Sequence, residues 1–194
     1  MAGETPDQVD VRARGLLGRT LHGHGVAVRI TEVEAYGGID DPASHAFTRT
    51  ARSEIMYGPP WRLYVYRSYG MHFCANVVTG PTERAAAVLV RAGEVVDGVE
   101  LARRRRPGVA DVALARGPGN LARALGLTLD DLDTDLLRPD GVRLGPDPQS
   151  PPEISAGPRV GVSRAADVPW RFWITGDPTV SAYRRSPRAD LTAG

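Results

Sequence analysis

Two carboxylates stand in the otherwise apolar segment Ile30–Tyr36 (ITEVEAY). Glu32 and Glu34 are two residues apart, so on a strand their side chains face the same side as those of Val28 and Ile30. Burying a carboxylate on an apolar face is costly unless it is paired or has a function. The segment therefore has two interpretations. Either these carboxylates pair with arginines or lie at a solvated strand edge, or one of them acts on a substrate.

An aromatic block follows at Leu63–Asn76 (LYVYRSYGMHFCAN). On a strand, Tyr64 and Tyr66 lie on one face, and Tyr69 lies on the other face near the Gly-Met turn. Aromatic faces can stack on nucleic-acid bases, each contributing about 1–3 kcal/mol, and a bulky side chain at a hairpin tip can fill a gap in a base stack. The alternative is a core strand with tyrosines at its rim.

Three further features are weaker as signals of function. Asp40–His45 (DDPASH) combines acids with a histidine, but the chain's four histidines lack the spacing of metal ligands, so we predict no metal site. Arg103–Arg106 suits the end of a helix or contact with phosphates. Gly117–Asn120 opens a helix, whose free N–H groups could hold a phosphate.

The elements that must position these residues read as short strands with interspersed helices, without regular βαβ alternation. We predict helices over Thr5–Leu17, Val95–Arg106, Asp111–Ala115 and Asn120–Leu125, and strands over Val26–Tyr36, Leu63–Tyr69, His72–Val78, Ala85–Ala92, Pro158–Ser163 and Trp170–Thr175. Gly37–Pro60 and Gly145–Pro158 read as loops, and Ser186–Gly194 reads as a loose tail. The pattern favours an α+β fold with a single domain over residues 1–194.

Composition excludes several classes of chemistry. All 24 basic residues are arginine, so no lysine is available for a Schiff base or a P-loop, and the net charge is only +1. A single cysteine, Cys74, excludes an intramolecular disulfide. Neither a signal peptide nor an uninterrupted apolar stretch of about 18–20 residues is evident, so we expect a cytoplasmic protein.

Taken together, the motifs resemble one family, the alkyladenine (3-methyladenine) DNA glycosylases of the alkylpurine type, especially their bacterial members. The resembling segments span nearly the whole chain: LLGR, ITEVEAYGGIDDPASHAF, TARSEIMYGPP, LYVYRSYGMHFCANVVTG, AVLVRAGE, RGPGNLARALGL and PRVGVSRAADVPWRFWITG. The resemblance implies a curved, open-barrel-like antiparallel sheet with surrounding helices and a protruding β-hairpin. It also implies no metal and no organic cofactor.

The resemblance implies a monofunctional glycosylase of base excision repair, which flips alkylated or deaminated purines out of duplex DNA and leaves an abasic site. Glu34 matches the general base that activates water, and Arg91 and the Val160 carbonyl match the groups that hold this water. Absence of lysine agrees with a hydrolase that has no lyase activity. The candidate lesions are 3-methyladenine, 7-methylpurines, hypoxanthine and ethenoadenine.

The resemblance also assigns the base pocket and the contact with DNA. Tyr36, His45 and Tyr66 match residues that sandwich the flipped base, and Asn76 matches one that disfavours the 2-amino group of guanine. His45 is also a candidate proton donor to neutral lesions. At the hairpin, Tyr69 and Met71 match the residues that intercalate.

The expected partner is double-stranded DNA with damaged purines, which the protein approaches from the minor-groove side. We expect a monomer associated with the nucleoid. We expect no contact with a membrane and no obligate protein partner. Two alternatives stay open, a damage-binding module without catalysis and a nucleoside or RNA N-glycosidase.

Overall fold

The computed structural model describes residues 8–68 and 70–189, and within these ranges nine strands form one antiparallel sheet. The main strand order is β3-β4-β5-β2-β1-β7. In addition, β6 pairs with β5, and β9 pairs with both β2 and β8. The strands are β1 (Thr20–Gly23), β2 (Val26–Tyr36), β3 (Leu63–Ser68), β4 (His72–Val78), β5 (Ala87–Asp97), β6 (Ala115–Arg116), β7 (Arg143–Leu144), β8 (Ile154–Gly157) and β9 (Arg171–Ile174).

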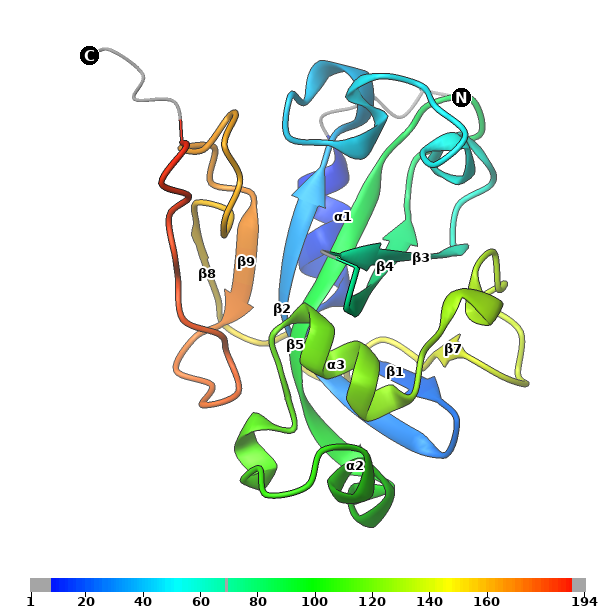
Figure 1. Ribbon diagram of the computed structural model, residues 1–194, viewed down its shortest axis with the longest axis vertical. Helices are drawn as coiled ribbons and strands as arrows, with labels where there is room; N and C mark the ends of the chain where they lie inside the picture. Colours follow the sequence, from blue (N-terminus) through cyan, green and yellow to red (C-terminus); the bar gives the residue numbers. More distant parts are fainter. Residues whose placement is uncertain (1–7, 69, 190–194) are drawn as a thin grey trace.

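Three α-helices and several single turns of 3-10 helix surround the sheet in the described part of the chain. The α-helices are α1 (Val9–Leu16), α2 (Val99–Arg105) and α3 (Pro118–Leu125), and the 3-10 turns are η2 (Gly38–Asp40), η3 (His45–Phe47), η4 (Glu54–Tyr57), η5 (Asp111–Ala113) and η6 (Leu129–Asp131). In Figure 1 the long strands β2 and β5 run through the middle of the molecule, with the β8–β9 ribbon beside β2 and the β3–β4 hairpin on the other side. The result is the predicted α+β fold, with a curled antiparallel sheet that forms a half-barrel. None of the helices described is long and apolar enough to span a bilayer.

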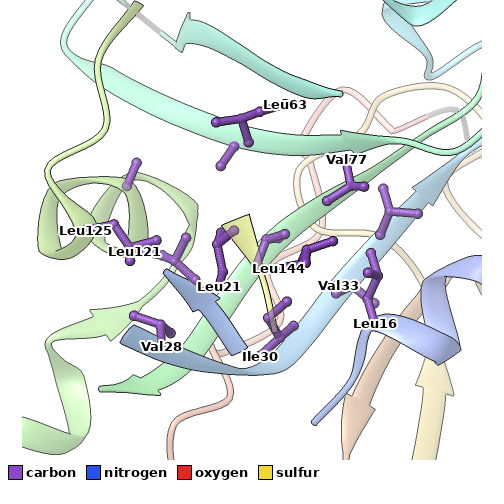
Figure 2. Packing of buried hydrophobic residues seen from close by; sticks show 14 of the residues in the cluster. Leu16, Leu21, Val28, Ile30, Val33, Leu63, Val77, Leu121, Leu125 and Leu144 are labelled. Carbon is purple, nitrogen blue, oxygen red and sulfur yellow. The ribbon is translucent and has the colours of Figure 1, made fainter. Parts of the chain in front are cut away.

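The main hydrophobic core lies where α1 and α3 pack on the sheet. Figure 2 shows Leu16 of α1 and Leu121 and Leu125 of α3 pointing toward the same apolar interior as Leu21, Val28, Ile30, Val33, Leu63, Val77 and Leu144 of the strands. Helix α3 ends at Gly126, whose φ of +77° is the left-handed conformation that glycine adopts without strain. The core thus fixes the central strands from which the polar residues described below project.

A β-bulge in β2 changes which side of the sheet the two glutamates occupy. Ile30 pairs with Gly93 of β5 and Glu32 with the adjacent Ala92, so Thr31 is an extra residue in the ladder. Because side chains alternate along a strand, the extra residue reverses the alternation beyond it. Our expectation that Glu32 and Glu34 share a side with Val28 and Ile30 is therefore wrong. After the bulge, Val33 and Ala35 continue the core.

The close approach of β2 and β5 at this point requires a glycine. A Cβ on Gly93 would lie 2.3 Å from Val28 Cγ1 and 2.4 Å from the carbonyl oxygen of Arg29. Real Cβ atoms do not approach neighbours so closely, so a side chain here would displace one of the two strands.

Most predicted elements are confirmed, including β2 at its predicted bounds and the hairpin strands up to Ser68 and from His72. The predicted helix over Thr5–Leu17 is confirmed as α1, but its Thr5 cap lies outside the described residues. Of the predicted tail, residues 190–194 also lie outside them.

Three predictions about element bounds are wrong. The helix predicted over Asp111–Ala115 is only the 3-10 turn η5, and Ala115 belongs to β6. The strand predicted over Pro158–Ser163 lies instead at Ile154–Gly157, where it pairs with β9, and Gly161 has a left-handed φ of +70° that interrupts an extended chain. The helix predicted from Val95 begins after Gly98. Val95 still pairs with β2, so tertiary pairing extends β5 beyond the predicted strand.

Candidate active site

A cavity of about 580 Å³ lies at the ends of β2, β4 and β5, between the loop that follows β2 and the loop around Val160. Its lining includes seven residues that the sequence predicts at the site: Glu34, Tyr36, His45, Tyr66, Asn76, Arg91 and Val160. They come from four strands, one 3-10 turn and one loop. Only the fold brings them together, because they span more than half of the chain.

Glu34 lies on β2 with no exposed surface, and three donors point at its carboxylate. The Val160 N–H donates to Oε1 at 2.6 Å, and the Tyr36 hydroxyl donates to Oε2 at 2.9 Å. Arg91 Nη1 also contacts Oε2, at 3.3 Å. A carboxylate offers about four lone-pair directions. Since two of these three donors share Oε2, Oε1 has a single donor and keeps the capacity to accept one further hydrogen bond.

Arg91 of β5 joins the two glutamates of β2. Its Nε donates to Glu32 Oε1 at 3.0 Å, while Nη1 reaches Glu34. Burial lowers the pKa of Arg91, but the charges of Glu34 and Glu32 outweigh that effect and raise it, so this buried guanidinium stays charged. Both glutamates thus have an arginine partner, as the ion-pair interpretation predicted, and Glu34 also faces the cavity.

Glu32 is fully buried and accepts four hydrogen bonds. In addition to Arg91, Arg171 Nε donates to Oε1 at 2.7 Å. Ser181 donates through its N–H to Oε2 at 2.7 Å and through its hydroxyl to Oε1 at 2.9 Å. Burial alone would raise the pKa of this carboxyl, but Arg91, Arg171 and Ser181 lower it overall. Glu32 therefore anchors β5, β9 and the C-terminal segment to the strand that carries Glu34.

Three aromatic rings form walls of the cavity. The ring of His45 lies 4.7 Å from that of Tyr66, edge to face, and Tyr36 stands on the Glu34 side. Burial and the charge of Glu34 place the pKa of Tyr36 well above its usual value, so the hydroxyl keeps the proton that it donates to Glu34. Walls of this kind suit a flat aromatic ligand.

His45 is held by a tyrosine that the predictions did not include in the pocket. Its Nδ1 lies 3.1 Å from the hydroxyl of Tyr64, which Arg52 also contacts. Partial burial against these rings, together with the positive charge of Arg52, lowers the pKa of His45 to about 4. The imidazole is neutral near pH 7, which weighs against our interpretation of His45 as a proton donor.

Asn76 is buried at the base of the cavity, on β4. Its Nδ2 donates to the carbonyl oxygen of Tyr64 at 3.1 Å across the β3–β4 ladder. This bond fixes the amide, so its bulk is a constant part of the cavity's shape.

Met71, one of the two residues expected to intercalate, does not line the cavity. Met71 is 76% exposed at the turn between β3 and β4 and borders a separate hollow that also contacts Arg123 of α3. Tyr69, the other residue expected to intercalate, lies outside the described residues.

The arginine run Arg103–Arg106 has a structural explanation. Arg105 donates to the carbonyls of Ala124 and His24, and Arg106 donates to those of Ala113 and Leu114. Arg103 pairs with Glu100 and Asp111. Three of the four arginines in this run thus hold α2 to its neighbours.

The sequence analysis missed two groups near the cavity. Arg52 lies over the Tyr66 ring, with its guanidinium carbon 4.8 Å from the ring centroid. Arg159 is buried and pairs with Asp41, 118 positions away. The isolated acidic pair Asp40 and Asp41 was the only local signal, and it did not identify a partner so distant in the chain.

Within residues 8–68 and 70–189, no group of three or more His, Cys, Asp and Glu side chains is arranged to hold a metal ion. Around Glu34, the polar groups are the carboxylate itself, an arginine, a tyrosine hydroxyl and a backbone amide. Such a set can orient and deprotonate a water molecule beside a flat ligand.

Comparison with known proteins points to one group. The family model described as "Methylpurine-DNA glycosylase (MPG)" matches residues 4–178. A Nocardia farcinica protein named "Putative 3-methyladenine DNA glycosylase" is 58% identical over 186 residues, which covers 91% of this chain and 88% of the relative. A Mycobacterium tuberculosis protein of the same name is 52% identical over 192 residues, covering 91% and 90%.

Proposed function

The chain belongs to the methylpurine-DNA glycosylase family, and we propose that it is a monofunctional DNA glycosylase that hydrolyses the bond between a damaged purine and deoxyribose in duplex DNA. The observation that carries the proposal is the buried Glu34 carboxylate, which faces a cavity with aromatic walls and accepts from Val160, Tyr36 and Arg91. The names of its relatives support 3-methyladenine as a substrate.

In the proposed reaction, Glu34 accepts a proton from a water molecule at its free acceptor direction. The water oxygen bonds to C1′ of the sugar, while the bond from C1′ to the purine nitrogen breaks and its electron pair leaves with the base. The transition state carries positive charge on the sugar, which a nearby carboxylate stabilises. The Val160 carbonyl and Arg91 would hold the water on the side away from the base.

An alkylated purine suits this arrangement because it already carries a positive charge and needs no proton to leave. A neutral His45 fits the same picture, since it adds no positive charge beside a cationic base. Tyr36, His45 and Tyr66 would stack on the flipped base, and Asn76 would exclude the 2-amino group of guanine.

Access to the base requires its rotation out of the duplex, at a cost of a few kcal/mol. We assign the filling of the gap to Tyr69 and Met71, from the minor-groove side. Without lysine the chain has no side-chain amine for a Schiff base, so the product would be an intact abasic site. In this proposal, the whole chain is one glycosylase domain that works as a monomer at the nucleoid.

Single-turnover base release tests the proposal, with duplexes that carry one lesion each. We expect the native protein to release alkylated purines and Glu34→Gln to be slower by about 10²–10⁴, the usual contribution of a general base. Glu94→Gln is the matched control, because Glu94 is a half-exposed carboxylate that pairs with Arg29 on the same two strands.

Three results would contradict the proposal. Tight binding to damaged duplex without release of any purine would leave a damage-binding module. Release from nucleosides or RNA alone would indicate another N-glycosidase. An equal loss in Glu94→Gln and Glu34→Gln would remove Glu34 from the chemistry.

A further inference from the structure

A buried ion pair, Asp41 and Arg159, lies beside the cavity without lining it. The Arg159 side chain has no exposed surface, and that of Asp41 is 2% exposed. The pair is bidentate, with Nη1 2.6 Å from Oδ2 and Nη2 2.9 Å from Oδ1. Nη1 also donates to the carbonyl oxygen of Ala35 at 3.0 Å. The guanidinium is therefore held between β2 and the loop that follows it.

Asp41 organises the loop that leads to His45. Its Oδ2 accepts from the N–H of Gly37, and its Oδ1 accepts from that of Ala43, each at 3.1 Å. Its carboxylate thus closes the chain on both sides of the η2 turn and connects it to Arg159. A shift of this carboxylate would move the segment that begins one wall of the cavity.

Arg159 also acts on a second segment that lines the cavity, through its position in the chain. The next residue is Val160, whose N–H donates to Glu34 Oε1 at 2.6 Å. The Arg159 guanidinium carbon also lies 4.8 Å from the ring centroid of Tyr36, the residue whose hydroxyl donates to Glu34 Oε2. One cation therefore touches or adjoins both neutral donors of the Glu34 carboxylate.

Stability alone does not account for this pair. Desolvation of two charges offsets much of their attraction, and apolar residues of similar size are often as stable. In addition, Arg159 Nε is buried without a hydrogen-bond partner in the part of the chain that the structure describes. An arrangement with such costs is expected where the geometry that it sets is needed.

We propose that Arg159 and Asp41 form a positioning pair that holds the Val160 amide and the Tyr36 hydroxyl against Glu34, and so sets the rate of base release. The inference rests on the proposed function. Neither residue is catalytic, because neither adjoins the reacting atoms. The pair acts on the step of bond cleavage and leaves binding to DNA nearly unchanged.

Three variants separate positioning from general support of the fold. Arg159→Lys keeps the charge but loses the bidentate geometry. Asp41→Asn/Arg159→Met makes the pair neutral, and Asn keeps one acceptor oxygen, which serves one of the two loop amides. Arg19→Lys is the matched control, because Arg19 is a largely buried arginine that donates twice to the Gly145 carbonyl and does not line the cavity.

Three measurements apply to each variant: single-turnover release corrected for the folded fraction, the Kd for a duplex with a tetrahydrofuran abasic-site analogue, and hydrogen exchange of the Val160 amide by NMR. For Arg159→Lys and the neutral pair we expect release to slow by about 10–100-fold, the effect of a displacement on the order of 1 Å, with Kd within about threefold. Exchange at Val160 should be faster by about tenfold or more, and Arg19→Lys should change none of the three.

Two outcomes in folded variants overturn the inference. If the neutral pair folds and retains the native release rate, the ion pair is structural. If release and Kd worsen together, the pair supports the DNA-binding surface. If Arg159→Lys does not fold, the measurements on Asp41→Asn/Arg159→Met test the inference. If neither variant folds, the pair has a role in folding and the inference is overturned. If the native protein releases no base, the proposed function fails. Hydrogen exchange of the Val160 amide still tests the positioning: faster exchange in the two variants supports it, and unchanged exchange refutes it.

Discussion

The two halves of β2 belong to one continuous strand but have different surroundings. The first half, Val26–Ile30, packs its apolar side chains into the core between α1, α3 and the sheet. The second half, Glu32–Tyr36, keeps Val33 and Ala35 in that core. It directs both Glu32 and Glu34 to arginines, and Glu34 also to the cavity. One extra residue between the halves separates these outcomes. A bulge can thus place charged side chains on a strand without interrupting the hydrophobic core that holds the strand in place.

The largest expected effect on stability comes from Glu32, the fully buried glutamate of the second half. Glu32→Gln removes the negative charge that faces Arg91 and Arg171, so we expect the free energy of unfolding to fall by about 3–5 kcal/mol. Urea denaturation measures this change, with Glu94→Gln as the control for an exposed pair. A loss below 1 kcal/mol would show that Glu32 is not the anchor that its four hydrogen bonds indicate.

The first half of β2 should respond differently. Ile30 is completely buried, so Ile30→Ala should lower the free energy of unfolding by about 2–5 kcal/mol through lost transfer energy and a cavity. Because its side chain points away from Glu34, the rate of base release per folded molecule should not change. A slower rate in the folded fraction would mean that the halves are not independent.

The bulge itself can be tested at Gly93. Gly93→Ala places a methyl group against Val28 and the Arg29 carbonyl, so we expect a loss of about 1–3 kcal/mol by overpacking, together with slower base release as β2 shifts. Gly15→Ala in α1 is the control. No atom of the described residues outside its immediate surroundings lies within 4 Å of an added Cβ there, and alanine should stabilise that helix by about 0.5–1 kcal/mol. Equal effects of the two substitutions would rule out a special role for Gly93.

The smallest expected effect concerns the loop after the second half. The pKa of His45 is about 4 in the folded protein against 6.5 as its usual value. As pH falls from 6.5 toward 4, the unfolded chain binds a proton and the folded protein does not, so stability declines over this window. His22, whose pKa is also lowered by burial, contributes in the same direction. His45→Gln should therefore reduce the decline without abolishing it, as thermal unfolding between pH 4 and 7 can measure. An unchanged pH dependence would contradict a neutral, partly buried His45.

Local patterns predicted much of the fold, but not the end of each element. The alternation in Val26–Tyr36 and the aromatic run from Leu63 gave strands at nearly their observed bounds, because a period of two depends only on neighbours. The strand predicted at Pro158–Ser163 is displaced because its pairing depends on β9, and the pattern of valines there does not encode a partner. For the same reason, β5 continues through Val95 where local sequence favours a helix.

The sequence by itself determined which residue types gather at the site. Resemblance to a family selected Glu34, Tyr36, His45, Tyr66, Asn76, Arg91 and Val160, and all seven line one cavity. Tertiary structure alone decided the side of the sheet that Glu34 occupies, the neutral state of His45 beside Arg52, and the pairing of Asp41 with Arg159. The side that Glu34 occupies and the Asp41–Arg159 pair depend on contacts between segments far apart in the chain, and the state of His45 depends on its burial in the folded protein. Their energies come from burial and charge in three dimensions, which a one-dimensional pattern of residue types does not contain.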